Sequence, residues 1–113
     1  MASDPVFVDY ICDQIREAGS IAFRKMFGEY AIYCDGKVVA LVCDNQLFVK
    51  PTIAGRSFVD RVDEAPPYPG AKPHFLVGEK LDDREWISHL VSITGRELPL
   101  PKPRKSRRPG SKA

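Results

Sequence analysis

The run of residues 23–51 constrains the fold of this chain more than any other feature. Short apolar segments alternate there with pairs of turn-forming residues. Asp35 and Gly36 are a strong hairpin signal, because a type I′ turn needs positive φ at both central residues. Asp44 and Asn45 have the same character, and Pro51 ends the run since proline cannot donate to a strand ladder. The run therefore predicts four consecutive antiparallel strands joined by tight turns.

Two-residue turns also predict which residues of neighbouring strands lie opposite each other. We expect the first turn at residues 28–29, and the next two at 35–36 and 44–45. A ladder without irregularities then pairs Phe27 with Tyr30, Lys25 with Ile32, Cys34 with Lys37, Ile32 with Val39, Tyr30 with Leu41, Cys43 with Gln46, and Leu41 with Phe48.

In this register both faces of the sheet are apolar, unlike a meander with one wet side. One face carries Phe23, Phe27, Tyr30, Ile32, Cys34, Val39, Leu41, Cys43 and Phe48. The other carries Met26, Ala31, Tyr33, Val38, Ala40, Val42, Leu47 and Val49. Either the helices divide between the two faces, or one face meets a partner, most simply a second copy of the chain. The candidate partner face consists of Tyr33, Val38, Ala40 and Val42.

Three helices are predicted around these strands, at residues 4–18, 53–62 and 82–95. Asp4 is a suitable N-cap for the first, and Thr52 for the second. Asp82 begins the third, with Glu85 three residues later as its capping-box partner. Glycines are expected to end the first and third helices, at Gly19 and Gly95.

The proline-rich segment 65–75 separates the second helix from a fifth predicted strand at residues 74–77. The predicted fold class is therefore α+β, with a mainly antiparallel sheet of about five strands. The elements follow the order α-β-β-β-β-α-β-α, and three helices pack on the sheet.

With 113 residues the chain is expected to form a single domain, which we place at residues 1–98. Residues 99–113, with prolines at alternate positions, predict a disordered, basic tail. Six of the 17 Lys and Arg residues lie in this tail, which has no acidic residue. The remaining chain carries 11 basic against 15 acidic side chains, so its net charge is negative.

The basic tail supports two interpretations. It could bind nucleic acid nonspecifically through phosphates, or it could be a plain solubilising end. The tail has no aromatic residue to stack on bases, so sequence-specific recognition of single strands is not expected. The residues concerned are Lys102, Arg104, Lys105, Arg107, Arg108 and Lys112.

The three cysteines do not form a disulfide framework. Their number is odd, and the predicted register places Cys34 and Cys43 roughly 20 Å apart along the ladder at about 3.3 Å per residue. A disulfide requires Cα atoms within about 7 Å. Cys12 in the first helix could reach one of these two, but we expect all three to be buried as small apolar side chains, as is typical of a cytoplasmic protein.

No catalytic, cofactor or metal site is predicted. His74 and His89 lack Cys, Asp, Glu or His partners at metal-binding spacing, and no nucleophile motif or glycine-rich phosphate loop is present. The longest apolar run, residues 38–43, is too short to cross a bilayer. The N-terminal residues lack the features of a secretory signal. We therefore expect a cytoplasmic, non-enzymatic protein.

One weak anion site is predicted at the start of the second helix. Lys50 and Arg56 would place cations near free N–H groups following Thr52, and Lys72 could join them from the proline-rich segment. The alternative is a surface helix cap with solvated charges.

Several segments together resemble the N-terminal domain of the TfoX/Sxy family. They are residues 24–30 (RKMFGEY), 35–37 (DGK), 47–51 (LFVKP), 68–73 (YPGAKP) and 98–103 (LPLPKP), so the resemblance covers about residues 6–105. It implies a non-enzymatic α+β domain related to regulators of bacterial DNA-uptake competence (transformation). Such a module would act through contacts with an unidentified protein, or as a homodimer.

Overall fold

The computed structural model describes residues 3–26, 28–59 and 61–99, and it confirms the α+β class. The elements are α1 (Pro5–Gln14), the 3₁₀ turn η1 (Arg16–Ala18), β1 (Ile21–Met26), β2 (Glu29–Cys34), β3 (Lys37–Cys43), β4 (Gln46–Val49), α2 (Ile53–Val59), β5 (Asp63–Ala65), β6 (His74–Val77), the 3₁₀ turn η2 (Glu79–Asp82) and α3 (Arg84–Glu97). The strands form one antiparallel sheet in the order β1-β2-β3-β4-β6-β5. It has six strands rather than about five, because the short strand β5 carries no apolar alternation that a sequence pattern could reveal.

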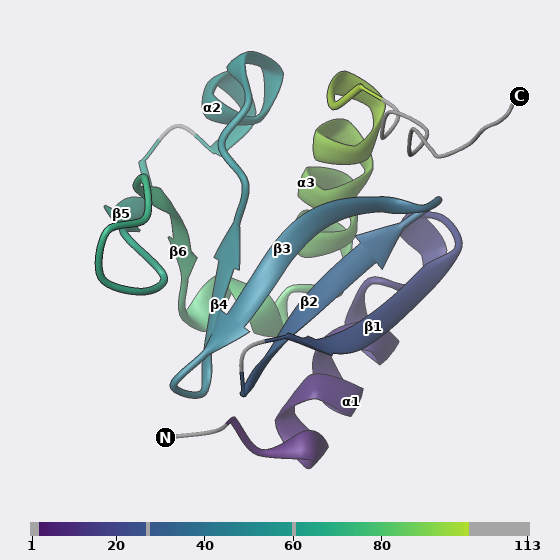
Figure 1. Ribbon diagram of the computed structural model, residues 1–113. Helices are drawn as coiled ribbons and strands as arrows, with labels where there is room; N and C mark the ends of the chain where they lie inside the picture. Colours follow the sequence, from purple (N-terminus) through teal and green to yellow (C-terminus); the bar gives the residue numbers. More distant parts are fainter. Residues whose placement is uncertain (1–2, 27, 60, 100–113) are drawn as a thin grey trace, which may run out of the picture.

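The helices and the sheet form two layers (Figure 1). α1 and α3 lie behind the sheet, and α2 packs against α3 beside the end of β4. Apolar residues of the helices and of one sheet face form a continuous buried core. From the helices it contains Val8, Ile11, Ile15, Val59, Ile87, Leu90 and Val91, and from the strands Tyr30, Ile32, Cys34, Val39, Ala40, Val42, Leu47, Val49, Phe75 and Val77.

The turns at residues 35–36 and 44–45 are as predicted. Asp35 has φ 52° and Gly36 φ 83°, while Asp44 and Asn45 have φ 53° and 56°. All four values match the left-handed geometry of type I′ turns. The predicted pairs Cys34–Lys37, Cys43–Gln46 and Leu41–Phe48 are therefore confirmed.

The first turn was predicted one residue too late. Met26 lies opposite Glu29, and Gly28 between them has φ 80°, while residue 27 lies outside the described residues. Lys25 consequently pairs with Tyr30, and the predicted pairs Lys25–Ile32 and Phe27–Tyr30 are wrong. Gly28 supplies the positive φ that the turn needs.

A β-bulge at Val39 overturns the rest of the predicted register. Tyr33 pairs with Val38, but Ile32 pairs with Ala40, so Val39 is an extra residue in β3. The predicted pairs Ile32–Val39 and Tyr30–Leu41 are therefore wrong. An extra residue reverses the facing of every side chain that follows it. The residues beyond the bulge consequently lie on the faces opposite to those predicted: Ala40, Val42, Leu47 and Val49 face the helices, and Leu41, Cys43 and Phe48 face away.

α1 begins as predicted but ends early. The Asp4 carboxylate accepts a hydrogen bond from the Val6 N–H at 2.9 Å, and the helix stops at Gln14 before η1. Gly19 is extended, with φ 160° and ψ −160°, rather than left-handed. A Cβ at this glycine would lie 2.8 Å from Cys34 Sγ, so glycine is required here by close approach and not as a helix cap.

α3 begins and ends later than predicted, and α2 is shorter. Asp83 rather than Asp82 caps α3, by accepting a hydrogen bond from the Trp86 N–H at 3.1 Å. The helix continues through Gly95 to Glu97. α2 ends at Val59 instead of residue 62.

Candidate functional site

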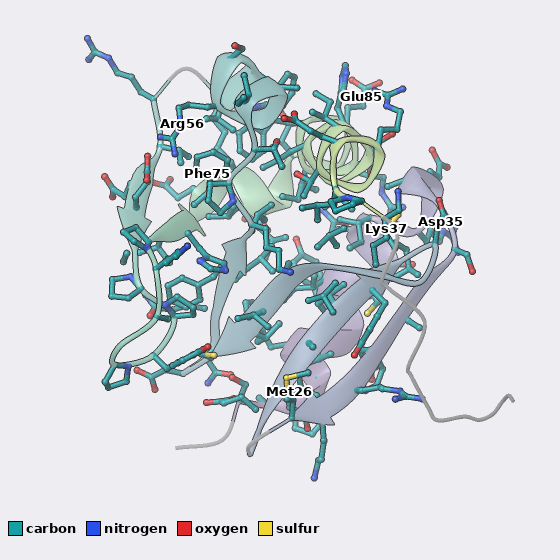
Figure 2. All side chains as sticks on the ribbon, turned by 45° about the horizontal axis from the view of Figure 1, so that its top comes forward. Met26, Asp35, Lys37, Arg56, Phe75 and Glu85 are labelled. Carbon is teal, nitrogen blue, oxygen red and sulfur yellow. The ribbon has the colours of Figure 1, made fainter. Side chains whose placement is uncertain are left out.

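The candidate site is the sheet face directed away from the helices. In the part of the chain that the structure describes, α1, α2 and α3 all leave this face uncovered (Figure 1). We call it the open face and define it by Met26, Tyr33, Val38, Leu41 and Cys43. The first four of these side chains are half-buried, and Cys43 is 9% exposed. Met26 lies at the end of the face nearest the β1–β2 turn (Figure 2).

A hollow of about 510 Å³ runs across the open face. Its lining is mostly apolar, and two charged side chains join it. Tyr68 of the loop between β5 and β6 contributes an aromatic wall and remains 56% exposed. The lining residues are Met26, Glu29, Tyr30, Val38, Leu41, Cys43, Lys50 and Tyr68. A mostly apolar hollow with a few polar groups at its rim is a candidate binding site.

A second hollow, of about 460 Å³, adjoins the first at the start of β3. Val38 and Lys50 line both hollows. In the second they lie beside Tyr33 and the last described residues, Leu98 and Pro99. The C-terminal end of α3 therefore lies at the edge of the open face (Figure 1).

Two of the four residues predicted for a partner face lie on the open face. Tyr33 and Val38 are directly opposite each other on β2 and β3. Ala40 and Val42 are fully buried in the core on the helix side, so their inclusion was wrong. The bulge at Val39 is the reason. Leu41 and Cys43, which the regular ladder had placed with Ile32, take their places.

Glu29 is a rim residue that sequence reasoning missed. Its carboxylate accepts hydrogen bonds from the Ser3 N–H at 2.8 Å and the Asp44 N–H at 2.9 Å. Burial by itself would raise the pKa of this carboxyl, but the hydrogen bonds from Asp44 and Ser3 lower it overall. Glu29 therefore fixes the N-terminal segment and the β3–β4 turn at one end of the hollow. Its place in the residue 24–30 motif was the available signal.

The predicted anion site at α2 is filled by the chain's own carboxylate. Glu97 accepts hydrogen bonds from the Ile53 N–H at 3.2 Å and the Ala54 N–H at 2.8 Å. Thr52 Oγ1 accepts a third, from the Gly55 N–H, at 2.9 Å. The free N–H groups on which the prediction depended are therefore already bonded, which favours the helix-cap alternative.

The cations predicted for that site have other positions. Arg56 pairs with Glu64, and its guanidinium lies 5.3 Å from the centre of the Phe75 ring (Figure 2). Lys50 lines the open face, and Lys72 is exposed on the loop between β5 and β6. The six basic residues predicted for nucleic-acid contact lie outside the described residues.

Cys34 and Cys43 are buried as predicted, whereas Cys12 is half-buried. All three are free, and burial raises the pKa of each thiol, that of Cys12 to about 11. A thiol with a raised pKa is protonated at neutral pH and is a poor nucleophile. Among the described residues no three His, Cys, Asp or Glu side chains form a group able to hold a metal ion. No described helix is both long enough and apolar enough to span a membrane.

These observations define a class of protein: a small two-layer α+β domain whose described helices lie on one face of the sheet and leave the other, mostly apolar face partly exposed. The chain belongs to the TfoX N-terminal domain family, whose model matches residues 13–96. It is also similar to the uncharacterized 12.7 kDa protein in the trpE 5′ region of Spirochaeta aurantia. The two are 38% identical over 107 residues, which cover 95% of this chain and 93% of the relative. The TfoX N-terminal domain is not a known enzyme family.

Proposed function

We propose that this protein is a non-enzymatic regulatory module that binds another protein through its open face. The apolar hollow across β3 is the observation that carries the proposal. Removing apolar surface from water favours association by about 25 cal/mol per Å² before the entropic and desolvation costs of binding are subtracted. The expected partner presents apolar side chains to Val38 and Leu41, and an acidic group that can pair with Lys50.

Family membership supports the regulatory part of the proposal. The TfoX/Sxy resemblance implies a role beside other regulators of bacterial competence, and this chain carries the N-terminal domain of that family. A cytoplasmic location fits the three free cysteines, since thiols stay reduced in that compartment. The same fold can serve different partners, and the chemistry of the open face rather than the fold selects the one bound here.

Affinity capture from cells tests the proposal, with the full chain as bait. Leu41→Lys places a charge in the hollow, whereas the matched control Ile53→Lys changes an apolar residue that is 82% exposed outside it. We expect the wild type and Ile53→Lys to capture the same protein, and Leu41→Lys to lose it. Circular dichroism confirms that both variants are folded.

Two outcomes would contradict this account of the open face. One is capture of the same protein by Leu41→Lys and by the wild type in equal amounts. The other is a stable dimer of the purified chain, measured by light scattering, that Leu41→Lys dissociates. In that case the occupant of the face is a second copy rather than a different protein.

A second proposed function is nonspecific binding of nucleic acid through the tail. It is favoured by the separation of charge, since residues 99–113 hold six cations and no acidic side chain. Neutralising phosphates releases counterions, so affinity should fall steeply with salt, with a log–log slope no steeper than about −5 for six contacts. Titration of duplex DNA at two salt concentrations, with and without Lys102→Ser and Arg104→Ser, measures this. Equal affinity for the wild type and the double variant at low salt would contradict it.

A further inference from the structure

β1 is the outermost strand at one end of the sheet, and among the described residues it pairs only with β2 (Figure 1). The Asp35 N–H donates a hydrogen bond to the Ser20 carbonyl, just before β1, at 2.9 Å. Because bonded positions alternate along an antiparallel ladder, the N–H and C=O groups of Ile21, Phe23 and Lys25 point away from β2. Unpaired backbone groups of this kind are a template for a further strand.

The side chains of β1 are also uncovered. Residues 22–25 are all exposed, whereas β2 and β3 have no exposed residue. Phe23 is 43% exposed, and its ring contacts Tyr30 edge-on, with 5.8 Å between the ring centres. A strand added at this edge would therefore pair the free backbone groups and cover an aromatic ring together.

The charges beside β1 are of opposite sign at its two ends. Exposed Glu17 and Asp35 lie at the start of the strand, and exposed Arg24 and Lys25 lie near its end. Figure 2 shows Asp35 and Met26 at opposite ends of the β1–β2 pair. Two antiparallel copies of β1 would bring the basic end of each strand against the acidic end of the other. This charge complementarity favours a second copy of the chain as the added strand.

Other charged groups near these ends already have partners in the chain. Arg16 pairs with Asp13 at 3.8 Å, and the Lys37 ammonium donates a hydrogen bond to the Gly95 carbonyl at 2.7 Å. Glu29 accepts hydrogen bonds from the N-terminal segment and from the β3–β4 turn. The opposite charges at the two ends of β1 are therefore left for an outside partner.

Hydrogen bonding and charge together select one register. Free backbone groups meet only when Ile21, Phe23 and Lys25 pair among themselves. A pairing centred on Arg24 or on Lys25 would place like charges directly opposite each other, which is unfavourable. A pairing centred on Phe23 places Lys25 opposite Ile21 of the second copy and Arg24 opposite its Ala22. Phe23 then faces its own counterpart.

We propose that two copies of this chain form a dimer by antiparallel pairing of β1, centred on Phe23. The contact is isologous, and each Lys25 is directed toward Glu17 and Asp35 of the other copy. Its two-fold axis is perpendicular to the sheet, so the two sheets become continuous and both open faces lie on the same side. The inference goes beyond the proposed function, because the dimer leaves the hollow at Leu41 free in each copy.

Cysteine crosslinking of the full chain tests both the strand and its register. Residues opposite each other in a hydrogen-bonded antiparallel pair have Cα atoms about 5.5 Å apart, which is within disulfide range. Under mild oxidation, Phe23→Cys should run as a dimer on a non-reducing gel. The matched control Lys25→Cys should not, because its counterpart lies about 13 Å away along the strand at about 3.3 Å per residue. The oxidised wild type measures any background from the three natural cysteines.

Light scattering of the reduced full chain supplies a second readout. The wild type and Leu41→Lys should have twice the mass of one chain, and Phe23→Pro the mass of one chain. Proline at position 23 removes an N–H that points away from β2, so it leaves the hydrogen bonds between β1 and β2 in place. Circular dichroism checks that this variant is folded.

A wild type with the mass of one chain would overturn the inference, and so would crosslinking of Lys25→Cys as readily as Phe23→Cys. A dimer that folded Phe23→Pro retains would overturn it too, because another surface would then hold the copies together. Failure here is separable from failure of the proposed function. If the wild type is a monomer but Leu41→Lys still loses the captured protein, only the dimer falls. If Phe23→Cys crosslinks as expected but Leu41→Lys retains the captured protein, only the partner proposal falls.

Discussion

Two glycines lie beside the same sulfur atom and should respond to alanine in opposite ways. A Cβ at Gly19 would lie 2.8 Å from Cys34 Sγ and 2.9 Å from Asp35 Oδ2, closer than packed atoms allow. A Cβ at Gly95, inside α3, would lie 3.6 Å from the same sulfur, which is ordinary contact. Gly19→Ala should lower the free energy of unfolding by roughly 1–3 kcal/mol. Gly95→Ala should raise it by up to about 1 kcal/mol through helix propensity.

Urea denaturation of the two variants measures both changes. Changes of the same sign would mean that the spacing around Cys34 is not as described.

Glu29 should give the folded state a dependence on acid pH. Its pKa is lower in the folded than in the unfolded chain, so its stabilisation is complete above the unfolded value of about 4.3. The stabilisation is lost as the pH falls through the lower, folded pKa. Gln at this position keeps one acceptor oxygen in place of two. Glu29→Gln should therefore cost roughly 1 kcal/mol at neutral pH, allowing for partial exposure of the side chain.

The difference between the wild type and Glu29→Gln should shrink toward low pH, as measured by denaturant midpoints at neutral and acidic pH. An equal difference in stability at neutral and at acidic pH would show that ionisation of Glu29 is not the cause of the pH dependence.

At the scale of elements, the bulge in β3 decides which residues face the solvent. Leu41 and Val42 are neighbours in sequence but lie on opposite faces. Leu41→Lys should cost less than about 1 kcal/mol, since a half-exposed lysine can extend its amine into water. Val42→Lys should cost more than about 3 kcal/mol, because it buries an unpaired charge in the core. Thermal denaturation compares the stability of the two variants. A larger loss for Leu41→Lys than for Val42→Lys would contradict the bulge and favour the regular ladder that the sequence predicts.

Glu97, the last residue of α3, links the end of that helix to the start of α2. It accepts hydrogen bonds from the first N–H groups of α2, at Ile53 and Ala54. Glu97→Ala should lower the free energy of unfolding by about 1 kcal/mol, as for loss of a helix cap. Hydrogen exchange should accelerate at Ile53 and Ala54, and not at Val8 in α1. Unchanged exchange at the first two would show that the cap is not needed.

Local signals were sufficient for most elements of the fold. The Asp-Gly and Asp-Asn turns predicted two hairpins, and Asp4 predicted the start of α1. The bulge was not predictable, because Val38, Val39 and Ala40 are all apolar and periodicity does not change when one of them is inserted. The bulge turned two of the four residues of the candidate partner face, Ala40 and Val42, toward the helices.

At the scale of the whole molecule, the unpredictable features join residues far apart in sequence. Glu29 bonds to Ser3 and Asp44, and Glu97 bonds to the start of α2. No pattern within one segment indicates such contacts, so an anion site was predicted where a carboxylate already lies. The sequence patterns of three amphipathic helices also do not predict which face of the sheet each helix covers. In the structure, all three leave the same face of the sheet free.

The central claim is that the open face is the surface at which this protein meets its partner. Photo-crosslinking in cells tests it most directly, with the crosslinking side chain at Leu41 in one full-length chain and at Ile53 in another. Ile53 is apolar and more exposed than Leu41, so it controls for nonspecific contact. We expect a discrete crosslinked protein from Leu41 and none from Ile53. Crosslinks of equal yield to the same proteins from both positions would contradict it.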